Sequence, residues 1–332
     1  MKKYLLTKWG NFYKANLHCH TTVSDGRLSP EEMREIYKEK GYSIIAYTDH
    51  DVLISHNELS DKDFLALNAF EVDITEKKEG DYRYKKCCHI CFIAMEPDNF
   101  EQPFYYNSQY LDINRDKMFN GENIKADFIG EYNHECINKA MKMGRENGFF
   151  ITYNHPTWSL ENYNDYIGYN NMNAMEIYNN GSATLGCSEY NDKEYDDMLR
   201  ANKRIFCVAT DDNHNWGNDS FGGFTMIKAE KLEYRAITRA LSSGNFYASQ
   251  GPEIYDLWYE DGKIGIKCSN VKKIVLNNCS RDASVINATE GETINSAEFE
   301  IIPEDIYVRI TITDFDGKKA NTNAYFTDEF FK

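Results

Sequence analysis

Short runs of apolar residues alternate with amphipathic stretches through the first 250 residues of the chain. Continuous apolar runs predict buried strands at 42–47, 64–70, 87–94, 149–153, 174–178 and 205–209. Helical spacing of apolar positions predicts helices between several of them, notably at 135–147 and 192–202. A further helix is expected after Ser29-Pro30-Glu31-Glu32, a capping-box pattern, and should end at Gly41. Strands that alternate with helices are typical of a parallel sheet with both faces covered.

Residue types that bind metals gather at or near the ends of these strands. They are Asp49-His50-Asp51, Glu71, His89, Asn154-His155-Pro156 and Asp211-Asp212-Asn213-His214. In a closed β/α barrel the carboxyl ends of the strands converge on one rim, where active sites lie. The convergence of so many His, Asp and Glu residues favours a barrel over an open doubly wound sheet. We therefore predict an α/β fold with a TIM-like barrel over residues 1–252.

Two segments break the alternation. Residues 98–133 are rich in Asn, Asp, Glu and Tyr and are too long for an ordinary connection. They predict either an inserted lid or a solvated excursion without a role in substrate selection. Over residues 253–332 short strands follow one another without helices, beginning with 254–258 and 263–267 around the turn Glu260-Asp261-Gly262. We expect a small β-sandwich-like domain there, which contains no histidine and should pack against the barrel and stabilise it.

Composition narrows the class of partner and the compartment. The chain has 37 Lys+Arg against 53 Asp+Glu, a net charge of −16 that opposes general binding to nucleic acid or to an anionic membrane. The apolar run at the N-terminus stops at Lys8, so we expect neither a signal peptide nor a membrane span. Nine cysteines without a framework spacing favour reduced thiols in the cytoplasm. Cys87, Cys88 and Cys91 lack a complementary pair and are expected to be buried in a strand.

The pair His18-x-His20 begins the candidate chemistry. Side chains two residues apart on a strand point to the same side, so these two imidazoles can hold one metal ion. Six of the eight histidines lie in the segments described, accompanied by three acids: His18, His20, His50, His89, His155, His214, Asp25, Glu71 and Asp212. Imidazole and carboxylate ligands without thiolate suit Zn, Mn or Fe at a catalytic site. Nine such residues suffice for two or three divalent ions.

The ordered motifs resemble those of the PHP (polymerase and histidinol phosphatase) family. The residues that carry the resemblance are Leu17-His18-Cys19-His20-Thr21-Thr22, Ser24-Asp25-Gly26, Thr48-Asp49-His50-Asp51, Glu71, His89, Asn154-His155-Pro156 and Asp212-Asn213-His214. The resemblance covers residues 14–250 and implies a distorted (β/α)7 TIM-like barrel with a trinuclear metal centre. The β-rich tail resembles the C-terminal extension of a two-domain subgroup that includes carbamate-ester hydrolase-like members.

The resemblance also implies which residues hold each ion. The first metal would be held by His18, His20, Glu71 and Asp212. The second would be held by Asp25, His50 and His214. Glu71 would bridge to a third metal held by His89 and His155.

These observations predict a metal-dependent phosphoesterase that acts on a small phosphorylated molecule through a metal-bridging hydroxide. Asp212 is expected to orient the nucleophile, and His20 and His214 are the further catalytic candidates. The same ligands would also serve a carboxylic or carbamate ester hydrolase or an amidase, and a metal-binding module without turnover is a third reading. An exonuclease is opposed by the charge of −16. The sequence fixes neither the substrate nor the oligomeric state.

Several side chains near the motifs have more ordinary expected roles. Asp49 should either accept a hydrogen bond from a ligand imidazole or solvate a loop. Trp158 and Tyr178 could wall a substrate pocket, but aromatic residues make up 14% of the chain, which favours core packing. His56 and His134 match no motif and are expected to be surface or loop histidines.

Overall fold

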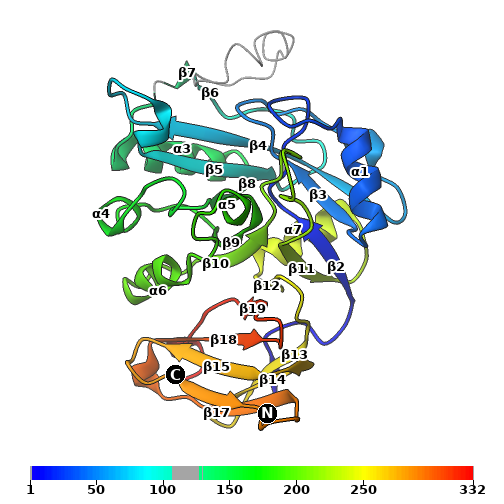
Figure 1. The fold of residues 1–332 in the computed structure, drawn as a ribbon, viewed down its shortest axis with the longest axis vertical. Coiled ribbons are helices and arrows are strands. Elements are labelled where there is room, and N and C mark those ends of the chain that lie inside the picture. The colour runs from blue at the N-terminus through cyan, green and yellow to red at the C-terminus, as the bar shows by residue number, and fades with distance from the viewer. Residues whose placement is uncertain (1, 107–126, 129, 332) are drawn as a thin grey trace.

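The computed structural model describes residues 2–106, 127–128 and 130–331, and its main body is a long curved sheet flanked by helices (Figure 1). In sheet order the strands are β10 (Phe206–Thr210), β9 (Ala174–Asn179), β8 (Phe149–Tyr153), β5 (Cys87–Ala94), β4 (Leu65–Thr75), β3 (Ile44–Tyr47), β2 (Asn11–Asn16), β11 (Phe224–Ala229), β12 (Phe246–Ser249), β19 (Lys319–Thr322), β18 (Tyr307–Thr313), β15 (Lys273–Asn278) and β16 (Ser284–Asn287). Strand β20 (Tyr325–Phe326) pairs with β18. The fold is therefore mixed α/β with a large sheet at its centre.

The strand–helix alternation predicts a parallel sheet, but the observed sheet is only partly parallel. Strands β2, β3 and β4 run parallel, as do β8, β9 and β10, but β5 runs antiparallel to both of its neighbours. The expectation fails here because residues 76–86, between β4 and β5, hold only the short turn η2 (Tyr82–Tyr84) and no crossover helix. The reversal pairs Asp73 with His89, so the start of β5 lies at the same edge as the end of β4.

The predicted closure into a barrel is not confirmed, since no ladder of the described residues joins the two ends of the path from β10 to β11. Side chains and single bridges connect these ends instead. The Thr225 hydroxyl of β11 accepts a hydrogen bond from the Ala209 amide (3.3 Å) and donates one to the Ala209 carbonyl (3.0 Å). Beyond the strands, Cys19 and Asn213 form an isolated parallel bridge. This bridge brings the His18-x-His20 segment beside the segment that carries Asp212.

Helices cover the outside of the sheet (Figure 1). They are α1 (Pro30–Glu39), α3 (His134–Glu146), α4 (Tyr163–Tyr166), α6 (Asp192–Arg200) and α7 (Tyr234–Ser242), whereas the short α5 (Asn180–Thr184) follows directly on the end of β9. The predicted capping box of α1 is confirmed, because Ser29 and Glu32 each bond the other's backbone N–H. Gly144 allows α3 to approach β5 closely, since a Cβ there would lie 2.5 Å from the Phe92 ring. No helix of the described residues is long and apolar enough to cross a membrane.

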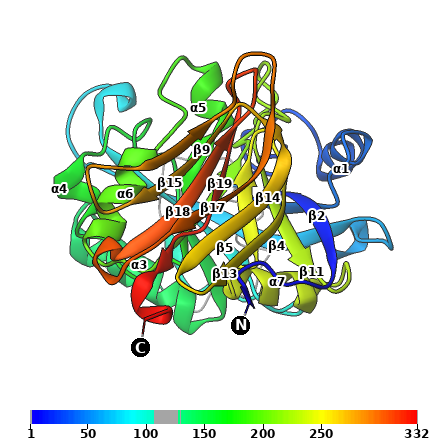
Figure 2. The same ribbon diagram turned by 90° about the horizontal axis from the view of Figure 1, so that it is seen from below.

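Part of the β-rich tail forms a second layer, seen from below in Figure 2, whereas β15, β16, β18 and β19 belong to the large sheet. Strands β1 (Lys3–Tyr4), β13 (Ile254–Glu260), β14 (Lys263–Val271) and β17 (Ile294–Glu300) make an antiparallel sheet, and the predicted hairpin pairs Glu260 with Lys263. An apolar cluster that includes Leu257, Ile266 and Ile310 joins it to the β15–β18 part of the large sheet. The shortest elements of the tail are the turns η3 (Pro303–Asp305) and η4 (Thr327–Glu329).

The structure describes only part of the segment 98–133, for which a lid or a solvated excursion was predicted. Residues 107–126 and 129 lie outside the described residues. The flanking strands β6 (Tyr105–Tyr106) and β7 (Asp127–Phe128) pair in parallel. A further turn, η1 (Asn57–Leu59), precedes β4. All nine cysteines are free, and those at 87, 88 and 91 are buried on β5 as expected.

Candidate metal centre

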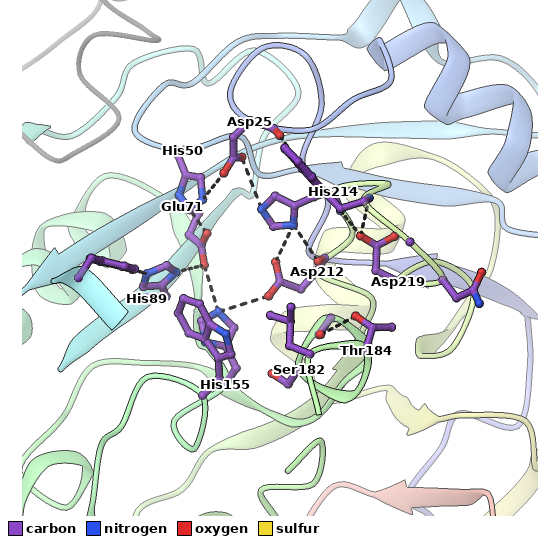
Figure 3. Close-up of a pocket in the computed structure, with 17 residues that line it drawn as sticks. Asp25, His50, Glu71, His89, His155, Ser182, Thr184, Asp212, His214 and Asp219 are labelled. Atoms are coloured by element: carbon purple, nitrogen blue, oxygen red, sulfur yellow. Dashed lines mark hydrogen bonds and ion pairs between the residues drawn. The ribbon is translucent and has the colours of Figure 1, made fainter. Parts of the chain in front are cut away.

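Nine His, Asp and Glu side chains meet at one end of the curved sheet, and Figure 3 labels those that line the cavity there. They are the nine predicted ligands, which the structure places as follows: His18, His20 and Asp25 after β2, His50 after β3, Glu71 on β4, His89 on β5, His155 after β8, and Asp212 and His214 after β10. Six of them are almost completely buried, whereas Asp25, Asp212 and His214 remain partly exposed.

Glu71 lies at the centre of this cluster. Its Oε1 is 3.1 Å from Nε2 of His18 and 3.2 Å from Nδ1 of His89. Its Oε2 is 3.2 Å from Nδ1 of His50 and 3.4 Å from Nε2 of His20, and it accepts no hydrogen bond from the described residues. Each carboxylate oxygen therefore faces a different pair of imidazoles, which is the arrangement expected of a bridging ligand.

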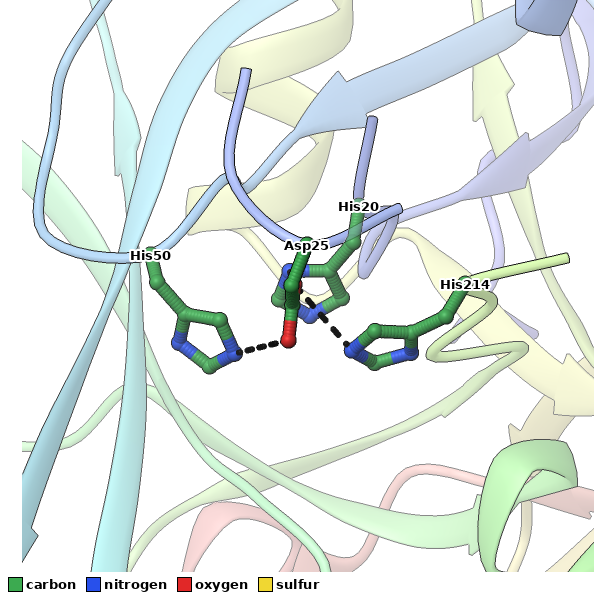
Figure 4. Close-up of side chains that lie close together, drawn as sticks. All are labelled: His20, Asp25, His50 and His214. Carbon is green, nitrogen blue, oxygen red and sulfur yellow. Dashed lines mark ion pairs between the residues drawn. The ribbon is translucent and has the colours of Figure 1, made fainter. Parts of the chain in front are cut away.

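A second group surrounds Asp25 (Figure 4). Its Oδ1 is 3.5 Å from Nε2 of His214 and 3.7 Å from Nδ1 of His20, and its Oδ2 is 3.8 Å from Nε2 of His50. These separations are too long for hydrogen bonds. They match ligand atoms around one ion, because ligands about 2.1 Å from a tetrahedral Zn²⁺ lie about 3.4 Å apart. Nδ1 of His20 is buried without a hydrogen-bond partner among the described residues, which also fits an ion.

A third group is built on Asp212. Nε2 of His18 and Nε2 of His20 lie 3.1 Å apart, and each is 3.2 Å from Oδ1 of Asp212. Nε2 of His155 lies 3.5 Å from Oδ2 of Asp212 and 3.7 Å from Oε1 of Glu71. Imidazole nitrogens and carboxylate oxygens thus converge from three sides, and the donor set suits a divalent cation.

Burial and the neighbouring charges shift the pKa values of several groups in the cluster, in directions that differ from group to group. Burial opposes ionisation of Glu71, but the facing imidazoles of His18 and His89 hold its pKa well below the usual range. Burial, with the neighbouring His20, lowers the pKa of His50 to about 3. Burial opposes protonation of His214, but Asp25 and Asp212 raise its pKa to about 9. The Glu71 carboxylate is therefore ionised at neutral pH and available to a cation.

Glu176 is a buried partner of the cluster that sequence reasoning missed. Its Oε1 lies 2.7 Å from Nδ1 of His18 and accepts a hydrogen bond from the Thr210 hydroxyl (2.6 Å). Its Oε2 accepts from the backbone N–H of His155 (2.9 Å) and from Nδ2 of Asn179 (2.8 Å). The available signal was a carboxylate in the middle of an apolar strand, since Glu176 is flanked by Ala-Met and Ile-Tyr.

Asp49 has neither of its two expected roles. Its carboxylate accepts from the backbone N–H and hydroxyl of Thr21 (both 2.8 Å) and from the same two groups of Ser24 (3.0 and 2.8 Å). It therefore shapes the loop that presents Asp25. Asp211 likewise anchors a loop, because the backbone N–H groups of residues 221–223 and the Tyr37 hydroxyl donate to it.

A cavity of about 530 Å³ opens over the cluster. Trp158 lines it, so the expectation that this residue packs in the core is wrong. Tyr178 does not line the cavity; it is buried on β9, where its hydroxyl bonds Asn180. His56 is buried against the Tyr47 ring rather than placed at the surface, whereas His134 is exposed at the start of α3.

No family model matches the sequence. One curated relative, a 5'-3' exoribonuclease of Haemophilus influenzae, is 42% identical over 45 residues, which is 14% of this chain. The match spans only 16% of the length of that relative.

Several solved structures are similar to the chain, and three of them follow. A two-domain protein of Bacteroides vulgatus, described as containing a predicted PHP-like metal-dependent phosphoesterase, is 16% identical over 95% of both chains with a TM-score of 0.46. A protein of Bifidobacterium adolescentis, described by prediction as a metal-dependent phosphoesterase, is 14% identical over 64% of this chain and 90% of its own, with a TM-score of 0.37. A Chromobacterium violaceum amidohydrolase, with bound sulfate and no metal, is 12% identical over 62% and 89%, also with a TM-score of 0.37. At these TM-scores, we base the assignment of function on the side chains of the cluster.

Proposed function

We propose that the chain is a PHP-type metal-dependent hydrolase that cleaves the phosphoester of a small phosphorylated molecule. The observation that carries the proposal is the position of Glu71, whose two carboxylate oxygens face different pairs of imidazoles at 3.1–3.4 Å. Such a carboxylate is suited to join two ions in one centre. The net charge of −16 and the clustered carboxylates make a polyanionic nucleic acid a poor substrate.

Two to three divalent ions, Zn, Mn or Fe, would be held by the nine side chains. His18, His20 and Asp212 with Glu71 form the first ligand set, and Asp25, His50 and His214 form the second. His89 and His155, again with Glu71, form the third. The bound ions would supply Lewis acidity, which lowers the pKa of water and neutralises charge on phosphoryl oxygens.

The catalytic groups of the chain itself are those that reach the cavity. Asp212 lines the cavity and is held by Nδ2 of Asn179, 3.2 Å from its Oδ2, so its carboxylate can orient an attacking water. His214 also lines the cavity, so its imidazole can contact the leaving oxygen of a bound substrate. His20 is fully buried below the cavity, so among the three catalytic candidates we assign it to metal binding alone.

The proposal also covers the fold of the two parts of the chain and the compartment. Residues 1–252 would form a distorted (β/α)7 TIM-like barrel whose last seam, between β10 and β11, is made by Thr225 rather than by a ladder. Residues 253–332 would form the supporting β-rich domain. Nine free cysteines support a reducing compartment such as the cytoplasm.

Metal analysis of protein purified without chelator, followed by assays of the Mn- or Zn-loaded protein, tests the proposal. We expect about two to three equivalents of metal and hydrolysis of aryl phosphates in preference to aryl carboxylic esters. His18→Ala should abolish turnover and lower the metal content, while the control His134→Ala, at an exposed histidine outside the cluster, should do neither. Less than about one equivalent of metal in the wild-type protein, or ester turnover without phosphatase activity, would overturn it.

A further inference from the structure

The walls of the cavity differ in character from its floor. The floor consists of the imidazoles and carboxylates of the proposed metal centre. The walls carry three aromatic side chains and one large aliphatic side chain, those of Tyr82, Trp158, Trp216 and Leu185. Trp216 and Leu185 are 65% and 69% exposed, so these two do not serve as core residues.

Trp158 and Tyr82 stand next to the ligands of the third proposed ion. The Trp158 ring lies edge-to-face with two of these imidazoles, with its centroid 5.4 Å from that of His89 and 5.0 Å from that of His155. The Tyr82 hydroxyl is 3.4 Å from Nε2 of His89. A substrate whose phosphoryl group reaches the metal centre would therefore bring its remaining part against aromatic surface.

Trp216 is held in place although it is exposed. Its Nε1–H donates to the backbone carbonyl of Asp25 at 3.2 Å, and the guanidinium of Arg27 lies 3.9 Å from the ring centroid. Arg27 lies over the indole, and the Trp216 side chain also lines the cavity. A ring that is fixed before a ligand arrives loses little freedom on binding, which is how rigid aromatic side chains favour recognition.

The walls carry little positive charge, and the Arg27 guanidinium, which lies against the Trp216 ring, is not itself a lining residue. None of the described residues that line the cavity is a lysine or an arginine. The polar wall residues Ser182, Thr184 and Asn218 are neutral, and the Asp219 carboxylate accepts from the backbone N–H groups of His214 (2.9 Å) and Trp216 (3.3 Å). A second phosphate or a carboxylate on the leaving group would find no lysine or arginine among the described lining residues, and the 530 Å³ cavity is of the size that takes a small organic molecule.

On the basis of the proposed function, we infer that the substrate is a phosphate monoester of an uncharged alcohol that carries a planar aromatic or heteroaromatic ring, which packs against Trp216 and Trp158. In the reaction, the oxygen of water forms a bond to phosphorus and the ester P–O bond breaks. The leaving oxygen takes up a proton, so the products are the aromatic alcohol and inorganic phosphate. Trp216 and Trp158 are then determinants of specificity rather than catalytic residues.

Paired compounds that differ only in the ring test this inference. 2-Phenylethyl and 2-cyclohexylethyl phosphate release alcohols of similar acidity, so the ratio of their kcat/KM values reports recognition of the ring. The corresponding phosphonates, which are not hydrolysed, give the same comparison as Kd values from calorimetry on the metal-loaded protein. We expect the wild-type protein to prefer the phenyl compounds by about tenfold, as stacking on an indole allows.

Trp216→Ala should reduce both preferences to about twofold or less. Trp9→Ala is the matched control, because Trp9 is also exposed and has Lys8 near its ring but does not line the cavity, and it should retain the wild-type preference. Since Trp216→Ala also removes the hydrogen bond to Asp25, Trp216→Phe and Trp158→Leu are measured beside it. Trp216→Phe should keep the preference and Trp158→Leu should lower it.

The outcomes separate this inference from the proposed function. If both phosphate esters are hydrolysed and the paired compounds show no difference in kcat/KM or Kd, the inference is overturned and the phosphoesterase remains. A preference that survives Trp216→Ala and Trp158→Leu also overturns it. If protein that holds its metal hydrolyses neither ester nor any aryl phosphate, the proposed function itself fails.

Discussion

Nδ1 of His18 lies 2.7 Å from Oε1 of Glu176, and both side chains are almost completely buried. The contact fixes the orientation of the imidazole, because the nitrogen bonded to the carboxylate leaves only Nε2 to face the cluster. The Thr210 hydroxyl and the backbone N–H of His155 bond the same carboxylate. Glu176 therefore ties together the segments that follow β2 and β8 and the end of β10.

Glu176→Gln should lower metal affinity about 10- to 100-fold, with a parallel loss of activity, because an amide orients the His18 imidazole less well than a carboxylate. The measurement is a chelator-competition titration of the purified protein. Glu233→Gln, at an exposed carboxylate that pairs with Lys231, is the control and should bind metal normally. Equal affinity in the two variants would show that Glu176 does not support His18.

Asp49→Ala should destabilise the protein and empty the proposed site at Asp25. The substitution removes the acceptor of four hydrogen bonds from Thr21 and Ser24 and leaves backbone N–H groups in the loop unsatisfied. We expect the free energy of unfolding, measured in urea, to fall by about 2–4 kcal/mol. Metal content should fall by about one equivalent. Asp49→Asn keeps one acceptor oxygen and should give a smaller loss; wild-type stability in Asp49→Ala would refute the role.

The strands could be predicted from the sequence where a continuous apolar run has polar residues on both sides. The predicted ranges 87–94 and 149–153 coincide with β5 and β8. The range 64–70 ends too early, because β4 continues to Thr75 with Glu71 and Asp73 paired to β5. A prediction based on apolar runs ends a strand at its first charged residue, even where the strand continues. The direction of β5 was also predicted wrongly. The strand is antiparallel to β4 because no crossover helix lies between the two strands.

The residues of the candidate site could likewise be predicted only in part. All nine candidate ligands could be chosen because His, Asp and Glu at strand ends carry a local signal, and the structure gathers them in one cluster. The supporting residues could not, because their roles depend on partners far along the chain: Glu176 is 158 residues from His18. Trp216 was likewise not considered, since nothing in the sequence places its ring over Asp25 and Arg27.

Gly26→Ala should disturb the Asp25 loop although Gly26 offers no ligand. A Cβ at this position would lie 2.5 Å from the carbonyl oxygen of His20 and 2.7 Å from the amide nitrogen of Thr21. Both are backbone atoms, so relief of the clash must displace His20 itself. We expect a loss of about 1–3 kcal/mol in urea unfolding and a lower metal content.

Gly251→Ala is the control for this substitution. Its Cβ would meet only side-chain atoms, of Lys318 at 3.3 Å and of Asp314 at 3.9 Å, and the change in stability should stay within about 0.5 kcal/mol. If Gly26→Ala behaves like Gly251→Ala in both measurements, close packing of the loop does not explain the glycine.

Glu161 should make stability fall as pH rises toward neutrality. Burial raises its pKa to about 7, against the opposing effect of three tyrosine hydroxyls that donate to it, those of Tyr132, Tyr153 and Tyr169. The other titratable groups that act on it or on its partners are Asp165 and Cys88. Between the ordinary pKa of 4.5 and about 7 the folded protein holds a proton that the unfolded chain has lost. The free energy of unfolding therefore falls by an amount on the order of 1–3 kcal/mol as the pH rises across this window. Above the window Glu161 causes no further fall.

Glu161→Gln should remove this slope, because the amide does not titrate. Urea unfolding at about pH 5, 6 and 7.5 gives the slope for each protein, and the difference between variant and wild type isolates Glu161 from the other acids. Glu131→Gln, at a nearby exposed carboxylate, should keep the wild-type slope. Parallel curves for wild type and Glu161→Gln would contradict the raised pKa.

Arg309 should hold the β-rich tail to helix α6. Its Nε and Nη2 each lie 2.8 Å from an oxygen of Asp196, and its side chain is 3% exposed. Removing one partner leaves the other charge poorly solvated, so Arg309→Met should cost about 2–4 kcal/mol in urea unfolding. The double variant Arg309→Met/Asp196→Asn should recover part of this loss, because no unpaired charge remains. Arg204→Met, at an exposed arginine that pairs with Asp328, should cost no more than about 1 kcal/mol, and additive losses in the double variant would show that the pair is not coupled.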